Sequence, residues 1–84
     1  IMEQVNNKLY GMTFTYYSKI CYRELINAMN HSSNHNIPGA YIYEQIGPGD
    51  ILMKIECDKN GYGLYYVINK KVFCYVSSQD VKEL

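Results

Sequence analysis

Three cysteines and two histidines are the residues of this sequence best suited to hold a metal ion or to act as nucleophiles. Cys21, Cys57 and Cys74 lie far apart, and no CxxC pair occurs among them. His31 and His35 are four residues apart, a spacing that suits a metal ion if the segment is helical. They lie in HSSNHN, however, whose composition is typical of a polar loop. We therefore expect neither a metal site nor a bound cofactor.

The eight carboxylates of the chain do not suggest a paired general acid and base. Glu44 and Glu56 lie in predicted strands, and the alternation of side chains places them on opposite faces of the sheet. The segments GPGD and GYG contain glycine but lack the strand–loop–helix setting of a phosphate-binding loop. The sequence therefore predicts a protein that is not an enzyme.

One stretch, GLYYVINKKVFCYVSS at residues 63–78, predicts a tight hairpin and resembles the start of a known catalytic domain. Gly63-Leu64-Tyr65 is similar to the first motif of the GIY-YIG nucleases, and Tyr75-Val76-Ser77 to the second, with serine in place of glycine. The resemblance covers residues 63–84 and implies a helix with an essential arginine and a later metal-binding glutamate. Leu84 stands about where that arginine belongs, and no glutamate follows. Since such chemistry needs both groups, a nuclease is the least favoured function.

Composition and charge exclude further classes of function. The 84 residues form one domain, residues 1–84, with Met2 after Ile1 as the expected native start. The formal net charge is zero and the basic residues are not clustered, so nucleic-acid binding is not indicated. The chain has no secretory signal, no apolar run of transmembrane length and an odd number of cysteines, which favours a reduced, cytoplasmic setting. A single arginine among many lysines, isoleucines and asparagines suggests an A+T-rich genome, such as that of a phage or mobile element.

Hydrophobic periodicity predicts the elements that carry these residues. KLYGMTFTYY at residues 8–17 is expected to form a strand, and SKICYRELINAMN at residues 18–30 an amphipathic helix. Ser18 is its expected N-cap, and an apolar stripe runs along it through Cys21, Leu25, Ala28 and Met29. The expected fold is α+β: one amphipathic helix packed on a four- to five-stranded antiparallel sheet, in the order strand, helix, then four strands.

From Ile37 onward the apolar residues alternate, so the two faces of the sheet can be derived from the turns. GPGD is expected to form a type II turn, and Asn60-Gly61 a two-residue hairpin loop. One face is almost wholly apolar and is expected to be the core beneath the helix: Ala40, Ile42, Ile46, Ile51, Met53, Ile55, Cys57, Leu64, Tyr66, Ile68, Phe73 and Tyr75.

The opposite face also carries apolar and aromatic residues, which one helix cannot cover as well. Exposed apolar patches of this kind usually mark interaction sites, and tyrosine suits them. The residues expected to bind a partner are Tyr41, Tyr43, Tyr65, Val67, Val72, Cys74 and Val76. The alternative is that the N-terminal strand or the C-terminal tail folds over this face.

These observations together predict a small non-catalytic binding protein, an inhibitor or adaptor of a larger protein. The partner is expected to be a protein or a second copy of the chain, and not a membrane. An alternative is the capture of a small, nucleotide-like ligand in an aromatic pocket between protomers.

Overall fold

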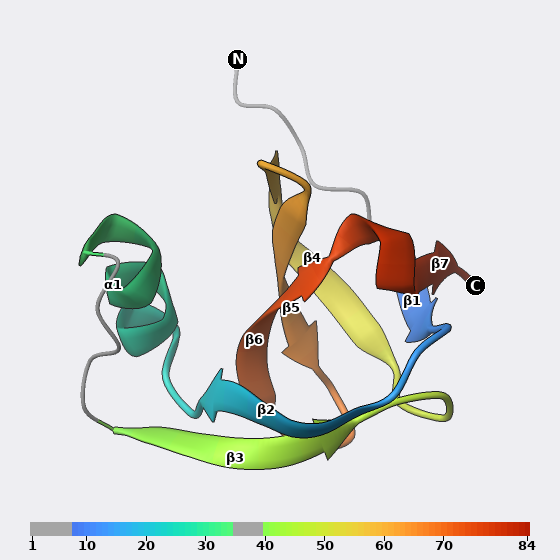
Figure 1. Ribbon diagram of the computed structural model, residues 1–84, viewed down its shortest axis with the longest axis horizontal. Coiled ribbons are helices and arrows are strands. Elements are labelled where there is room, and N and C mark those ends of the chain that lie inside the picture. The colour runs from blue at the N-terminus through green and yellow to red at the C-terminus, as the bar shows by residue number, and fades with distance from the viewer. Residues whose placement is uncertain (1–7, 35–39) are drawn as a thin grey trace.

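The computed structural model describes residues 8–34 and 40–84, and it is dominated by one antiparallel sheet (Figure 1). The side chains of His31, His35 and Cys57 lie outside the described residues. The sheet has seven strands in the order β3-β2-β6-β5-β4-β1-β7. The elements are β1 (Leu9–Met12), β2 (Tyr16–Tyr22), α1 (Leu25–Asn34), β3 (Tyr41–Ile46), β4 (Leu52–Lys59), β5 (Tyr62–Val67), β6 (Val72–Ser77), the 3₁₀ turn η1 (Ser78–Asp80) and β7 (Val81–Glu83). The expected four- to five-stranded α+β fold with a prominent helix is therefore wrong.

The expected helix over residues 18–30 is wrong in its first half. Residues up to Tyr22 continue β2, whose aromatic and β-branched side chains suit a strand. Helical hydrogen bonding starts later, where Glu24 accepts hydrogen bonds through its carbonyl oxygen from the backbone of Asn27 and Ala28 at 3.2 and 3.3 Å. Cys21 therefore belongs to the sheet, and Ala28 is fully buried, alone among the helical positions 25–30 whose burial the structure describes.

The main core lies on the inner side of a strongly bent sheet. In Figure 1, β2 and β3 run across the view while β5 and β6 run steeply up it. The buried side chains on this inner side come from strands β1 to β6. We call this set the inner core: Met12, Cys21, Ile46, Leu52, Tyr65, Val67, Val72, Cys74 and Val76.

A smaller cluster lies on the outer side, where α1 packs. It consists of Tyr22, Ala28 and Leu64, with Ile20, Ile55, Phe73 and Tyr75 packed against it. Much of the predicted core face therefore lies outside: Met53 is 38% exposed and Ile68 39% exposed. On β4, β5 and β6 the main core lies on the face that the sequence predicted to be open to a partner, because the bend of the sheet encloses it. On β3 the predicted faces are correct, since Ile46 is buried in the inner core and Tyr43 is exposed.

The local turns form as the sequence predicts. Asn60 and Gly61 have φ angles of 55° and 83°, as a two-residue hairpin loop requires, and Lys59 pairs with Tyr62 across it. In the GPGD turn, Gly49 has a φ of 104°, and the amide of Asp50 donates to the carbonyl of Gly47 at 3.0 Å. This geometry is that of a type II turn.

The strands on either side of the GPGD turn do not pair with each other, although the sequence predicts a hairpin there. β3 pairs with β2, and β4 pairs with β5 and β1. In this turn the Asp50 carboxylate accepts a hydrogen bond from the Asn69 side chain at 2.7 Å and forms an ion pair with Lys70 at 3.3 Å. These contacts tie the GPGD turn to the β5–β6 turn.

Candidate interaction edge on strand β3

The structure divides the seven residues predicted to bind a partner into two groups. Tyr65, Val67, Val72, Cys74 and Val76 are all 0% exposed and belong to the inner core. Their expected exposure is wrong, because the bend encloses them. Tyr41 and Tyr43 are 40% and 59% exposed, and both lie on β3. Partner binding by these two tyrosines is not tested by the fold and remains a prediction.

Strand β3 lies at one end of the sheet and, within the described residues, pairs with β2 alone. An end strand presents backbone N–H and C=O groups that another extended chain can pair with. Natural edge strands are usually protected by proline, by charged side chains or by short length. β3 is six residues long, contains no proline and has a single charged residue, Glu44.

The opposite edge of the sheet is protected in the usual way. β7 is only three residues long, and two of them, Lys82 and Glu83, are charged and exposed. Glu83 also forms an ion pair with Lys8 at 3.2 Å. Of the two edges that the described strands form, β3 is therefore the less protected one.

Aromatic side chains extend along the outer side of the β3 edge. The rings of Tyr41 and Tyr43 are 5.6 Å apart and meet edge to face at 89°. A hydrogen bond with Tyr41 raises the pKa of the Tyr43 hydroxyl, so the Tyr43 hydroxyl is neutral at physiological pH. Ile20 on β2 lies directly opposite Tyr43 and continues this apolar strip into the sheet.

A hollow of about 280 Å³ lies beside the N-terminal end of β3. It is lined by Tyr41 and Ile42 of β3, by Ala40, and by Arg23, Glu24 and Asn27 near the start of α1. A chain running along β3 would meet this hollow next to Tyr41. Its charged and amide groups can hydrogen-bond side chains of such a chain.

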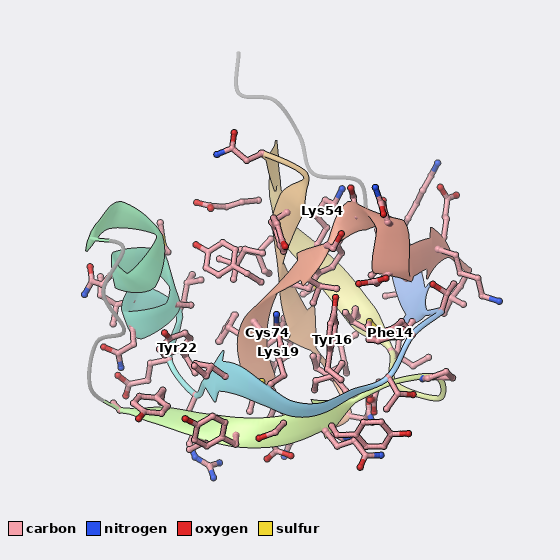
Figure 2. All side chains as sticks on the ribbon, viewed as in Figure 1. Phe14, Tyr16, Lys19, Tyr22, Lys54 and Cys74 are labelled. Carbon is pink, nitrogen blue, oxygen red and sulfur yellow. The ribbon has the colours of Figure 1, made fainter. Side chains whose placement is uncertain are left out.

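A second hollow, of about 380 Å³, lies where β2 diverges from β6. Its lining comes from Tyr16, Ser18, Lys19 and Ile20 of β2 and from Tyr75 of β6. The Lys19 ammonium lies 4.6 Å from the centroid of the Tyr16 ring. In the view of Figure 2, Lys19 of β2 and Cys74 of β6 lie close together above β2. This hollow lies between two strands whose pairing was not predicted from the sequence.

The hairpin that resembles the GIY-YIG nucleases does not bring its two tyrosines together. Tyr65 pairs with Cys74, and the preceding Leu64 pairs with Tyr75. Because neighbouring residues on a strand point to opposite faces, Tyr65 and Tyr75 lie on opposite sides of the sheet. They cannot contribute to one active site in this arrangement.

Among the residues whose side chains the structure describes, no three His, Cys, Asp or Glu gather where they could hold a metal ion. No helix in the described part of the chain has the length and apolar character needed to cross a membrane. Comparisons with protein-family models, with curated proteins and with solved structures return no match.

Sequence reasoning missed two features of this region. The pairing of β3 with β2 was hidden because residues 18–24 were expected to be helical. The meeting of Cys21 with Cys74 was missed for the same reason. The alternation of aromatic and other residues in YYSKICY is the signal that favours a strand there.

Proposed function

We propose that the protein is a non-catalytic binding protein that takes an extended segment of another polypeptide along the edge of β3. The observation that carries the proposal is the six-residue edge strand, which contains no proline and one charged residue, with Tyr41 and Tyr43 exposed beside it. Strand addition of this kind gains affinity from main-chain hydrogen bonds, and side-chain contacts give it specificity.

The chemistry of the edge favours a polypeptide over other ligands. A formal net charge of zero offers little attraction to a phosphate backbone. Tyrosine side chains supply a large contact area with few rotatable bonds, which suits a protein interface. The nucleotide-pocket alternative is not retained, because Tyr65 lies in the inner core and is not exposed to line a pocket between protomers.

We further propose an inhibitor or adaptor role towards a larger protein in a reduced, cytoplasmic setting. The small size of the chain supports such a role. The free thiols of Cys21 and Cys74 support the reduced setting. The compositional bias toward lysine, isoleucine and asparagine supports an origin in a phage or mobile element.

Peptides selected from a random display library against the immobilised protein test the proposal. We expect Tyr41→Lys and Tyr43→Lys each to weaken the binding of a selected peptide by at least about tenfold, which corresponds to about 1.4 kcal/mol. The reason is that lysine on an edge strand opposes pairing with another strand. Tyr62→Lys is the matched control, since Tyr62 is also exposed (51%) but lies on β5.

Both β3 variants should keep the wild-type melting temperature, because their side chains are exposed in the folded state. Equal peptide affinity for wild type and both β3 variants would contradict the proposal, as would a library that yields no binding peptide. Molar mass in solution provides a second check. A dimer that Tyr43→Lys dissociates would show that a second copy, and not a foreign polypeptide, pairs with β3.

A further inference from the structure

Two buried thiols face each other across the joint between β2 and β6. The registered pair at this joint is Tyr22 with Phe73, so the next position of the antiparallel ladder sets Cys21 opposite Cys74. Both cysteines are 0% exposed, both are free thiols, and both belong to the inner core. Facing residues of an antiparallel pair have Cα atoms about 4.5–5.5 Å apart, which is within the range that a disulfide spans.

The joint opens immediately beyond the two cysteines. The hollow of about 380 Å³ is lined by Ile20, the chain neighbour of Cys21, and by Tyr75, the chain neighbour of Cys74. A small oxidant can therefore approach the thiols through a local separation of β2 from β6, without global unfolding.

The two thiols differ in acidity. The hydrogen bond between them lowers the pKa of Cys21, an effect that exceeds the opposing effect of burial and that the Lys19 charge reinforces. The same hydrogen bond and burial raise the pKa of Cys74 well above its ordinary value. Because the thiolate is the nucleophile, Cys21 is the sulfur that attacks first.

We propose that Cys21 and Cys74 form a reversible disulfide with a low-molecular-weight disulfide as the oxidant, and that this bond locks β2 and β3 to β6. The Cys21 thiolate attacks one sulfur of the oxidant, which forms a mixed disulfide and releases one thiolate. Cys74 then loses its proton and attacks the Cys21 sulfur, which releases the second thiolate. Two protein thiols are oxidised to one disulfide, and the oxidant is reduced to two thiols.

This proposal does not depend on the binding function of β3. Its consequence is a covalent link at a joint where the strands otherwise share the single registered pair Tyr22 with Phe73. The link closes a long loop of chain, which constrains the unfolded state. We expect the oxidised protein to melt at least about 5 °C above the reduced protein.

The test treats the folded protein with oxidised glutathione and follows its mass, with Cys57→Ser as the background that removes the third cysteine. The expected product has lost two hydrogen atoms, contains a peptide that links Cys21 to Cys74, and reverts with dithiothreitol. In the same background, Cys74→Ser should stop at a glutathione adduct on Cys21, because the second thiol is missing.

If the Cys57→Ser variant folds poorly, the same oxidation is followed in the wild-type protein by peptide mapping. The same Cys21–Cys74 link is expected there. Persistence of both free thiols, or glutathione adducts on both cysteines without a link, would overturn the proposal. An unchanged melting temperature after the disulfide has formed would contradict the claim that the bond stabilises the pairing of β2 with β6.

Discussion

Asp50 holds a charge in the interior at the point where two turns meet. Asp50 is only 7% exposed. Its carboxylate accepts hydrogen bonds from the Gly47 amide at 2.8 Å and from the side-chain amide of Asn69 at 2.7 Å. Burial alone would raise the pKa of this carboxyl, but the bonds from Asn69 and Gly47 and the charge of Lys70 lower it overall. The carboxylate form therefore stabilises the fold.

Asp50→Asn should lower the free energy of unfolding at pH 7 by about 1–3 kcal/mol, since the partners of the carboxylate lose a charged acceptor. Because the folded pKa is depressed, the stabilisation is present above the unfolded value near 3.9 and is lost as the pH falls through the folded value. The variant should therefore lose less stability than wild type between pH 5 and pH 2. Urea unfolding across this pH range measures both effects.

The matched control for this variant is Glu83→Gln. Glu83 forms an exposed ion pair with Lys8, and such pairs contribute little. We expect a change of no more than about 0.5 kcal/mol at pH 7. If Asp50→Asn matched this control, the interpretation of Asp50 as the link between the two turns would be wrong.

Local turn chemistry is predictable at the scale of one element, whereas strand pairing is not. Asn60-Gly61 and Pro48-Gly49 contain their turn signals within two residues, and both turns form. Which strand pairs with β3, in contrast, depends on packing against residues that are far away in the sequence. Residues 18–24 show why: β2 ends with Cys21 and Tyr22 fully buried, at positions that also suit the apolar stripe of a helix. The choice between helix and strand is then made by tertiary packing.

Lys71 adopts an unusual backbone conformation in the β5–β6 turn, with a φ of 59°. A left-handed conformation costs a residue with a side chain about 1–2 kcal/mol, and glycine avoids this cost but loses more backbone entropy on folding. Lys71→Gly should therefore raise the free energy of unfolding by up to about 1 kcal/mol. Thermal and urea unfolding measure the change.

Lys82→Gly is the control for the turn variant, because Lys82 is an exposed strand residue that has no positive φ. It should destabilise the protein by about 0.5–1 kcal/mol. Destabilisation by Lys71→Gly to the same extent would show that Lys71 is not strained in the turn.

At the scale of the whole molecule, the bend of the sheet decides which residues form the core. The sequence correctly indicated two apolar faces and one helix, but it assigned the helix-covered face as the core. Alternation of side chains defines the faces without saying which one is inside. The inner core includes both Met12 of β1 and Ile46 of β3, which lie towards opposite ends of the strand order, and no local pattern encodes that they share one core.

Adjacent residues on β4 provide a direct test of this reversal. Leu52 is 0% exposed in the inner core, and Met53 is 38% exposed on the outer side. Leu52→Ala should cost about 2–5 kcal/mol of unfolding free energy because it leaves a cavity, and Met53→Ala less than about 1.5 kcal/mol. Chemical denaturation of the two variants compares them. A larger loss for Met53→Ala would mean that the outer side is the core.

The same bend leaves β3 as an open edge, and this edge is the basis of the proposed function. Amide hydrogen exchange of the protein, free and saturated with a selected peptide, tests the claim most directly. Strand addition predicts that exchange slows at the amides of residues 41–46 when the peptide binds, because they gain hydrogen-bond partners or lose access to water. Slower exchange elsewhere, at β7 or α1, with β3 unchanged would contradict binding at this edge.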